Sequence, residues 1–437
     1  MESNIFQKHG DKLLFILALA VLATALLRLG TKSEPIPPVE PSMIFSHWEG
    51  APEAEILQAL IKEFESLHEG IKITLETRSY EELRDLLFNQ AEVESIEDGS
   101  LEDGSLKETF EEPTEFPGYI FPGDILIIDP LWVPELIERE IIENTRNEGR
   151  RNESRRNENP IISFKNVMYY NIEILREAGF NRPPRSREEF LNYARALSSE
   201  DRPNGVQSLV LGAGSSRGIY DDIYPWIWAA GAELIRNGQP ALNSQPIINS
   251  LAFLATLNRE GLIAPGAFSN DADEKLEGFV HGRAAFMIAP SSHISFVREK
   301  MGDEAFGITS VPIPENFIGV SFFGSAGWML GVNSASAYRD EARLFVNFLT
   351  ERASLFSELS MAVPGNGIPL PSQDPFYTKL MDLAIAAEPE QDFAGMPWSE
   401  LEAIFREELL GMFEERSNPA ETAAAIQRRW TERLADW

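Results

Sequence analysis

A glycine-rich turn is the first candidate for chemistry, as a phosphate-binding element. Gly212, Gly214 and Gly218 follow an apolar stretch, residues 206–211, that is predicted to be a strand. Glycines at such a turn let backbone N–H groups approach a phosphate. The last interval is one residue longer than in the dinucleotide fingerprint, and residues 219–225 do not open a clean helix. We therefore interpret the segment as a plain turn and expect no cofactor.

The patterns that could support catalysis are incomplete. Residues 323–327 resemble a nucleophile elbow, but Phe323 replaces its first glycine and no neighbour stands out as a base. The five histidines contain no pair at helical metal-ligand spacing. The sequence has no cysteine, which excludes disulfides, thiolate metal sites and a cysteine nucleophile. Among 69 acidic residues some will meet in any fold, so no glycosidase pair is inferred. We predict a protein that is not an enzyme and binds no metal.

Tryptophans favour ligand binding more than any other residue type here. Six of them fall at predicted strand ends or in predicted loops: Trp48, Trp132, Trp226, Trp228, Trp328 and Trp398. Aromatic faces pack on the apolar faces of sugar rings, while neighbouring Glu, Asn and Ser side chains bind the hydroxyls. Packing in the core is the alternative for each one. Together they favour a sugar-like ligand.

The elements that would position these residues alternate between strand and helix. Residues 43–45, 71–75 and 125–128 are predicted strands, with helices over 53–67 and 80–90 between them. This order predicts a parallel sheet covered on both faces. Further predicted strands are 167–170, 206–211, 284–288 and 328–332, and further helices are 171–178, 186–197, 291–300, 340–350 and two in 398–434 that separate at Asn418-Pro419. A chain of 437 residues is expected to form two lobes.

The charge balance excludes one class of partner. Lys and Arg number 38 against 69 Asp and Glu, so the net charge is −31. A surface this acidic repels phosphates, and no basic stripe interrupts it. Nucleic-acid binding is therefore not expected.

The N-terminus predicts export. Lys8 and Lys12 precede an apolar run, residues 13–27, which is short for a membrane span and matches the core of a signal peptide. Both cleavage near Ala25 and retention as a signal anchor remain open for residues 1–30. Residues 31–41 contain four prolines and form a stiff linker. We expect an extracytoplasmic protein, in the periplasm or on the outer face of the cytoplasmic membrane.

Two insertions have a five-residue period. Glu-Asp-Gly-Ser repeats within residues 91–119, and Arg-Asn-Glu occurs three times within residues 145–159. Neither period fits a buried helix or strand, and both segments are poor in apolar residues. We interpret them as solvated loops.

The order of several short segments resembles the family 1 extracellular solute-binding proteins, the group that includes maltose-binding protein. The segments are 43–49, 123–129, 132–136, Tyr169-Tyr170-Asn171, Ala178-Gly179, 183–190, 226–231, 279–288 with Gly-Arg-Ala-Ala-Phe-Met, and 307–314 leading to Gly327-Trp328. The chain departs from the family in lacking the lipid-attachment cysteine, in the acidic insertion, and in having Gly231-Ala232 where a glycine pair is common.

The resemblance implies an α/β fold like that of periplasmic binding proteins, with two lobes, hinge crossover strands and a ligand cleft. Lobe I would comprise 42–160 and 289–328, and lobe II would comprise 161–288 and 329–437. The crossovers would lie near 161–164, 284–288 and 328–332. Ligand contact with both lobes would favour the closed state.

The resemblance also implies ligand-binding positions and partners. The positions are His47, Trp48, Glu49, Asp129, Trp226, Trp228, Glu233, Ser291, Ser292, Phe323, Gly324, Trp328 and Trp398. The partners would be a small solute, expected to be a carbohydrate, the transmembrane subunits of an ABC permease, and the membrane through the N-terminal segment. The protein is expected to act as a monomer.

Three other interpretations remain open. The first is a membrane-tethered ligand sensor or adaptor with the same fold. The second is a receptor for a solute that is not a sugar. The third, more distant, is a secreted carbohydrate-active enzyme, which would need a carboxylate pair in the cleft.

Overall fold

The computed structural model describes residues 41–48, 51–88, 121–143, 161–198, 206–214, 217–324, 327–365, 369, 371–389, 393, 396–435 and 437. The predicted export segment, most of the Pro-rich linker, both insertions and Glu49 lie outside the described residues. Across the described ranges, none of the helices combines the length and the apolar character needed to cross a membrane.

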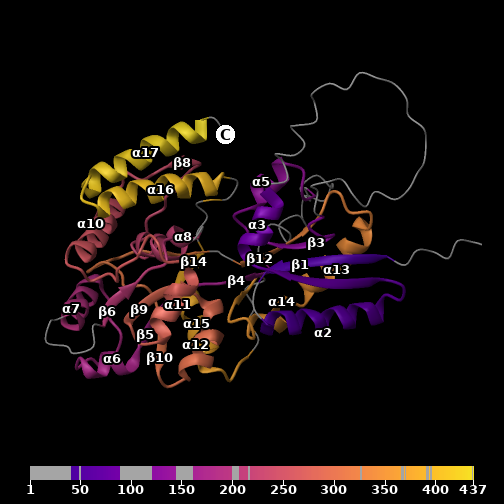
Figure 1. Cartoon of the computed structure of the whole chain (residues 1–437), viewed down its shortest axis with the longest axis horizontal. Coiled ribbons are helices and arrows are strands. Elements are labelled where there is room, and N and C mark those ends of the chain that lie inside the picture. Colours follow the sequence, from indigo (N-terminus) through magenta and orange to yellow (C-terminus); the bar gives the residue numbers. More distant parts are fainter. Residues whose placement is uncertain are drawn as a thin grey trace, which may run out of the picture. The chain divides into compact units, whose positions relative to one another are not determined.

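A six-stranded sheet organises the first lobe, with the strand order β13-β4-β12-β3-β1-β2. Its strands are β1 (Ser42–Trp48), β2 (Lys72–Arg78), β3 (Ile125–Ile128), β4 (Ile162–Ser163), β12 (Gly327–Val332) and β13 (Val363–Pro364). β1 pairs in parallel with β2 and β3, as expected, but β12 runs antiparallel to β3, so the sheet is mixed. The helices beside it are α2 (Ala51–Leu67), α3 (Tyr80–Phe88), α5 (Val133–Glu138), α13 (Arg339–Glu351) and α14 (Ala353–Ser357) (Figure 1).

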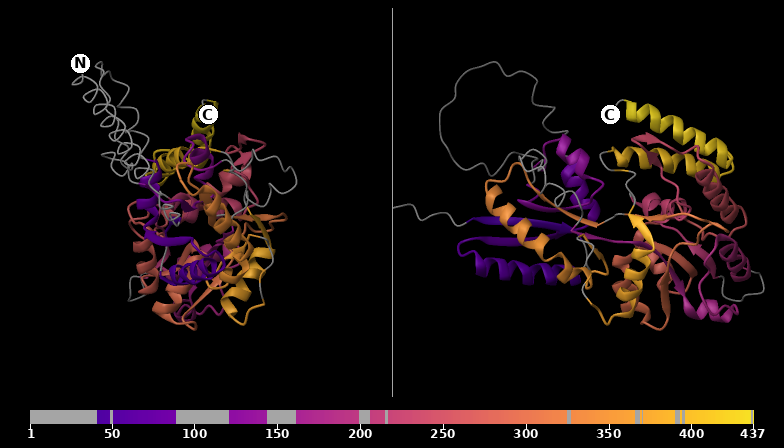
Figure 2. Two further views of the ribbon diagram at one scale, coloured as in Figure 1. Left: turned by 90° about the vertical axis from the view of Figure 1, so that its right-hand side faces the viewer. Right: turned by 180° about the vertical axis from the view of Figure 1, so that it is seen from behind.

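A four-stranded sheet with the order β10-β5-β9-β6 organises the second lobe. Its strands are β5 (Asn166–Asn171), β6 (Gln207–Val210), β9 (Ala284–Pro290) and β10 (Phe306–Thr309). β5 runs antiparallel to both of its neighbours, and β6 is parallel to β9. The longer helices of this lobe are α6 (Ile172–Glu177), α7 (Arg187–Leu197), α10 (Gln245–Arg259), α11 (Ala272–Val280), α12 (Ile294–Met301), α15 (Pro375–Ile385), α16 (Trp398–Phe413) and α17 (Pro419–Ala435) (Figure 2).

Short elements complete the second lobe. They are the helices α8 (Gly218–Asp222) and α9 (Tyr224–Trp228), the 3-10 turn η3 (Ser291–His293), the hairpin β7 (Ile235–Arg236) and β8 (Gln239–Pro240), and the parallel pair β11 (Ser321–Phe323) and β14 (Ala387–Pro389). Trp226 and Trp228 therefore lie in a helix, and the expectation that they stand outside helices is wrong. Residues 219–225 were not expected to open a clean helix, yet the short helix α8 begins at Gly218, without a side-chain cap.

The described chain passes between the two sheets at three places. Only Phe164 and Lys165 separate β4 of the first sheet from β5 of the second. The chain returns to the first sheet between β10 and β12, and leaves it again after β13. The first crossing lies at the predicted position, 161–164. A crossover over 284–288 is wrong, because β9 pairs with β5 and β6 inside the second sheet.

Sheet membership also corrects the predicted lobe boundaries. Residues 289–328 were expected in the first lobe, yet β10 pairs with β5 of the second sheet. Residues 329–437 were expected in the second lobe, yet β12 and β13 belong to the first sheet. The apolar side chains of Gly327–Val332 predict a buried strand. They do not predict the sheet in which that strand pairs.

Helix ends follow the local chemistry of the sequence. The Ser186 side chain accepts a hydrogen bond from the Glu189 backbone N–H at 3.2 Å, so it caps α7 at the residue where the helix over 186–197 was predicted to begin. At the expected break between the last two helices, the Asn418 side chain accepts from the N–H groups of Ala420 and Glu421, both at 3.0 Å. Such caps satisfy donors that have no partner within the helix.

A buried carboxylate lies where α16 meets α8. Glu402 is only 4% exposed, and its Oε1 accepts a hydrogen bond from Arg406 Nη2 at 2.9 Å. Burial raises the pKa of Glu402 to about 7, against the opposing effects of Arg406, the Ile219 backbone N–H and Arg84 of α3. A carboxyl group with a raised pKa binds its proton more tightly in the folded state than in the unfolded state.

We expect Glu402→Gln to remove a pH-dependent loss of stability. The free energy of unfolding should fall as pH rises from about 4.5 to about 7, because the folded state holds the proton through that range. The shift corresponds to about 3 kcal/mol. Burial also lowers the pKa of His293 to about 4, with an opposite effect on stability, but this cancels between wild type and variant. Urea unfolding of the wild type and of Glu402→Gln, at pH 4.5 and at pH 7.5, measures the difference in their free energies of unfolding. The same difference at both pH values would contradict the assignment.

Candidate ligand-binding site

An aromatic cluster lies at the C-terminal end of β1. Trp48 ends β1, Tyr80 begins α3, and Trp132 precedes α5. The ring centroids are 5.5 Å apart for Trp48 and Tyr80, 5.4 Å for Trp48 and Trp132, and 4.7 Å for Tyr80 and Trp132. All three residues come from the first lobe. We call them the first aromatic cluster.

Asp129 stands beside this cluster, directly after β3, and is fully buried. Its Oδ1 accepts a hydrogen bond from the Leu131 backbone N–H at 2.9 Å, and its Oδ2 accepts one from the Tyr80 hydroxyl at 3.0 Å. The same Oδ2 also accepts a hydrogen bond from Arg217 Nη1. Arg217 belongs to the turn before α8, so this ion pair joins the two lobes.

Arg217 is held from both sides. Its guanidinium also pairs with Asp221 at 3.3 Å, and it lies 5.8 Å from the ring centroid of Tyr80 and 5.0 Å from that of Tyr220. Burial opposes the charge, but Asp221, Tyr80 and Tyr220 raise the pKa of Arg217 above its ordinary value. The described part of the glycine-rich segment has turns at residues 213–214 and 217, as predicted, and Arg217 at its end forms the ion pair between the lobes.

The polar contacts continue to the hinge. Asn166, the first residue of β5, donates from Nδ2 to Asp221 Oδ1 at 3.0 Å. Asp129, Arg217, Asp221 and Asn166 therefore form a continuous polar chain from the first sheet to the second. We refer to these four residues as the polar chain.

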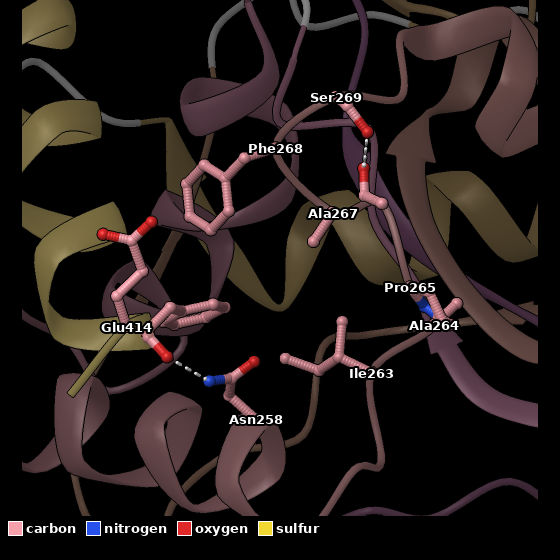
Figure 3. Close-up of a pocket in the computed structure, with 10 residues that line it drawn as sticks. Asn258, Ile263, Ala264, Pro265, Ala267, Phe268, Ser269 and Glu414 are labelled. Atoms are coloured by element: carbon pink, nitrogen blue, oxygen red, sulfur yellow. Dashed lines mark hydrogen bonds between the residues drawn. The ribbon is translucent and has the colours of Figure 1, made fainter.

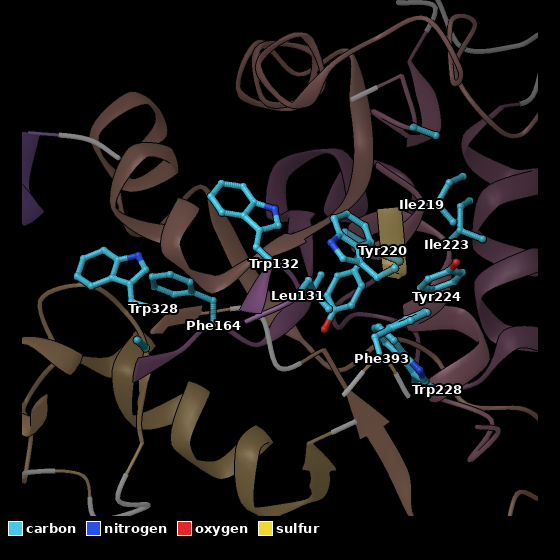
Figure 4. Packing of buried hydrophobic residues seen from close by; sticks show 14 of the residues in the cluster. Leu131, Trp132, Phe164, Ile219, Tyr220, Ile223, Tyr224, Trp228, Trp328 and Phe393 are labelled. Atoms are coloured by element: carbon cyan, nitrogen blue, oxygen red, sulfur yellow. The ribbon is translucent and has the colours of Figure 1, made fainter. Parts of the chain in front are cut away.

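A second aromatic cluster borders the polar chain in the second lobe. Tyr220 lies 5.0 Å from Trp228, and Tyr224 lies 5.6 Å from both Trp228 and Phe393, as ring centroids. Figure 4 shows these four side chains close together, all of them in the buried core. The polar chain thus lies between aromatic groups of both lobes.

Gly324 is needed at the edge of this cluster. A Cβ atom at this position would stand 2.5 Å from Asn166 Oδ1 and 2.9 Å from a ring carbon of Tyr220. Any larger residue would have to displace the amide of Asn166. The glycine at the predicted position 324 therefore allows Asn166 and Tyr220 to pack closely against the main chain.

Two buried polar atoms beside the polar chain have no hydrogen-bond partner among the described residues: Trp132 Nε1 and Asn166 Oδ1. Buried polar atoms in folded proteins almost always have a partner. One atom is a donor and the other an acceptor, and the hydroxyls of a sugar could satisfy both. Asp129 and Asp221 would be further hydroxyl acceptors.

The structure brings several predicted residues to this region. In the first lobe, Asp129 and Trp48 both contact Tyr80. In the second lobe, Trp228 and Gly324 lie beside Tyr220. Phe323 lies beside the hinge, because the Lys165 Nζ atom is 3.9 Å from the centroid of its ring. None of these is shown to touch a ligand, so their role stays a prediction.

Other predicted residues pack within the protein. His47 donates from Nδ1 to the Trp48 carbonyl and lies 6.4 Å from the Trp328 ring, which is also 5.9 Å from Phe164. Burial lowers the pKa of His47. Figure 4 shows Trp328 beside Phe164, away from Tyr220 and Trp228.

The remaining predicted positions are spread over the second lobe. Trp226 packs between Phe190 and Phe253, with centroids at 5.2 and 5.1 Å. Ser291 donates to the Met361 carbonyl at 2.5 Å. Trp398 begins α16, 6.3 Å from Tyr220. Glu233 forms a surface pair with Arg236 at 3.0 Å, and Ser292 is partly buried in η3.

Sequence reasoning missed Tyr80, Arg217, Tyr220, Asp221 and Asn166 as site residues. Arg217 and Asp221 are four residues apart at the start of a helix, a spacing that favours an ion pair. That signal is visible in the sequence. The pairing of Arg217 with Asp129, 88 residues earlier, has no local signal.

A buried ion pair fixes the turn that carries Arg217. Asp222 accepts from Lys275 Nζ at 2.6 Å through Oδ1 and from the Gly212 N–H at 2.6 Å through Oδ2. Lys275 Nζ also donates to the Ile288 carbonyl at 3.0 Å. Burial raises the pKa of Asp222, against the opposing effect of Lys275.

A separate pocket lies within the second lobe, with a volume of about 420 Å³ (Figure 3). It is lined by Asn258, residues 263–269, Phe413 and Glu414. Asn258 donates to the Phe413 carbonyl at 2.8 Å, and Ser269 donates to the Gly266 carbonyl. Glu414 pairs with Arg416. Because these polar groups already have partners, the pocket offers little to fix a solute, and it shares no residue with the polar chain.

One curated relative matches part of the chain. A protein of Deinococcus radiodurans described as "Probable ABC transporter-binding protein" is 25% identical over 198 residues, which are 44% of this chain and 46% of the relative. The match thus spans about half the length of that curated relative.

Solved structures with the same fold include sugar-binding proteins. The GacH receptor of Streptomyces glaucescens, solved unliganded and with acarbose, has a TM-score of 0.70 at 16% identity, covering 91% of this chain and 99% of its own. The cyclic alpha-maltosyl-1,6-maltose binding protein of Arthrobacter globiformis has a TM-score of 0.67 at 16% identity, covering 91% and 100%. At this identity the likeness establishes the fold, which is the two-lobed α/β fold that the sequence predicts.

The family is established by a match over most of the chain. Residues 50–354 match the bacterial extracellular solute-binding protein family. This range contains all strands of both sheets except β1 and β13, and all four residues of the polar chain. The chain belongs to the bacterial extracellular solute-binding proteins.

Proposed function

We propose that this protein is the extracytoplasmic receptor of an ABC importer, that it binds a sugar or oligosaccharide between its lobes, and that it delivers this solute to a permease without converting it. The observation that carries the proposal is the pair of buried unpartnered atoms, Trp132 Nε1 and Asn166 Oδ1, beside carboxylates and aromatic rings. A sugar presents both hydroxyls and an apolar ring face, so it matches this mixture.

The receptor role is supported by similar proteins. The matching Deinococcus radiodurans protein is described as "Probable ABC transporter-binding protein", and solved structures of this fold include an acarbose complex of the GacH receptor and a cyclic alpha-maltosyl-1,6-maltose binding protein. Attachment to the membrane through the N-terminal segment, and action as a monomer, belong to the same proposal.

Closure of the lobes follows from the position of the site. A solute that contacts Asp129 of the first lobe and Asn166 or Asp221 of the second binds the closed state more tightly than the open state. The ion pair between Asp129 and Arg217 already joins the lobes at this point. The permease would then recognise the closed form.

We expect a sugar to raise the melting temperature of the purified protein and to remain intact. A ligand at a hundred times its dissociation constant stabilises the folded state by about 2.7 kcal/mol, which a thermal-shift assay detects. The screen covers mono- and oligosaccharides and polyols, with amino acids, polyamines and phosphate as controls. Chromatography of the recovered sugar tests for turnover.

The possible results separate the alternatives. A shift with a non-sugar solute alone would show that the proposed substrate class is wrong. Conversion of the sugar would indicate an enzyme. Uptake of the identified solute by a deletion strain at the wild-type rate would favour a sensor over a transport receptor.

A further inference from the structure

A buried lysine, Lys165, occupies the hinge, and no carboxylate of the described residues pairs with it. Lys165 is 3% exposed and lies between β4 of the first sheet and β5 of the second. Within the described residues its Nζ forms neither an ion pair nor a hydrogen bond; its recorded contact is the face of Phe323, at 3.9 Å. Burial lowers the pKa of Lys165 to about 7, and no described charged neighbour contributes to this shift.

The main chain holds Lys165 firmly in place. Its backbone N–H donates to Ser291 Oγ at 3.2 Å, and its carbonyl accepts from the Ser291 N–H at 2.9 Å. These bonds tie the crossing to the end of β9. These bonds fix the main chain of Lys165, and the Phe323 ring is the recorded contact of its amine.

The next residue, Asn166, is 4% exposed and carries the unpartnered Oδ1 described above. Its amide nitrogen donates to Asp221, so Asn166 joins the hinge to the other residues of the polar chain. The cation of that chain is fully engaged, because Arg217 faces the two carboxylates of Asp129 and Asp221. Among the described residues, no carboxylate pairs with Lys165 in this way.

A buried ammonium without a counter-charge is costly, and the face of one phenyl ring offsets only part of that cost. An anion brought by a ligand would offset the rest and form a short, charge-assisted hydrogen bond. Resting on the proposed function, we propose that Lys165 and Asn166 form a subsite selecting sugars that carry an anionic group, either a carboxylate or a phosphate. Lys165 binds the anion and Asn166 Oδ1 accepts from a neighbouring hydroxyl.

The net charge of −31 does not oppose this subsite at close range. At physiological ionic strength the field of surface charges is screened within about 8 Å. Local groups therefore decide the preference, and a desolvated cation interacts more strongly than a solvated one. The acidic surface is expected to slow the encounter with anionic sugars without excluding them.

Isothermal titration calorimetry on the full-length protein with matched neutral and acidic sugars tests the proposal. The pairs are glucose with glucuronate, galactose with galacturonate, and glucose with glucose 6-phosphate. We expect at least one acidic sugar to bind tenfold or more tightly than its neutral partner. Lys165→Met should bring that ratio close to one, Lys165→Arg should restore part of it, and Lys62→Met, at an exposed position of α2, should leave it unchanged.

Proton uptake is a second readout that does not depend on a variant. An anion beside Lys165 should raise its pKa from about 7, so binding of an acidic sugar at pH 8 should take up protons. Titrations in two buffers with different ionisation enthalpies measure this uptake. A neutral sugar should show none.

Each outcome is decisive. A preference for glucuronate without glucose 6-phosphate identifies a carboxylate ligand, and the reverse identifies a phosphate. Tight binding of neutral sugars with no acidic preference, or a preference that survives in Lys165→Met, overturns the subsite but leaves the proposed function intact. Failure of every sugar to bind overturns both.

Discussion

Lys275→Met should lower the free energy of unfolding by about 3–5 kcal/mol, because it leaves the carboxylate of Asp222 buried without its counter-charge. Asp222 is fully buried, and the Lys275 side chain is 3% exposed. Methionine nearly matches lysine in length, so the change removes charge and hydrogen bonds with little loss of packing. Urea unfolding near neutral pH measures the effect.

A matched control separates burial from charge. Lys72 and Glu65 also form an ion pair, at 3.2 Å, but Lys72 is 59% exposed. Lys72→Met should change stability by less than about 1 kcal/mol, as exposed pairs do. If both variants lose the same small amount, the Asp222–Lys275 pair is not the anchor that its burial indicates. Lys275→Met should also weaken solute binding in the surviving folded protein, because Asp222 holds the Gly212 N–H and so the turn that carries Arg217.

Local patterns in the sequence predict most of the elements. The four residues of β3 are predicted at their observed bounds, because Ile125–Ile128 is a continuous apolar run, buried throughout. α17 begins at Pro419, where the Asn-Pro pair places a helix start. These signals are local, and local chemistry decides them.

The assembly of those elements is not specified locally. β12 is apolar and was identified as a strand, but only its pairing with β3 and β4 shows that it belongs to the first sheet. Trp226 and Trp228 have the same residue type and are two positions apart, yet Trp226 packs in the lobe core while Trp228 contacts Tyr220 near the polar chain. Residue type cannot separate these roles, because both tryptophans are fully buried.

The ion pair between the lobes shows the same limit for the site. Asp129 was predicted as a ligand-binding position, and Arg217 was not considered, although both contribute to one buried contact. In the sequence, Arg217 is only an arginine after a glycine-rich turn, and Asp129 is only an aspartate after a strand. Their meeting depends on how β3 and α8 are placed across the two sheets.

Asp129→Ala should weaken binding of the identified solute by about 10- to 150-fold, the equivalent of about 1.5–3 kcal/mol for a hydrogen bond to a charged group. Asp129 Oδ2 already receives bonds from Tyr80 and Arg217, and it is the described carboxylate that joins the first lobe to the polar chain. Asp382→Ala, at an exposed position of α15, is the control and should bind as the wild type does. Calorimetry with the sugar found in the screen measures both, and equal affinities would contradict the role of Asp129.

A double-mutant cycle then shows how Asp129 acts. If the ion pair persists in the complex and holds the lobes closed, Arg217→Ala should weaken binding, and combining it with Asp129→Ala should add little, since either change alone breaks the pair. If the solute instead displaces Arg217 from Asp129, Arg217→Ala should strengthen binding, because the carboxylate no longer has to exchange partners. We expect the first result: Arg217 retains Asp221 on its own lobe, and the rings of Tyr80 and Tyr220 on either side hold it in place.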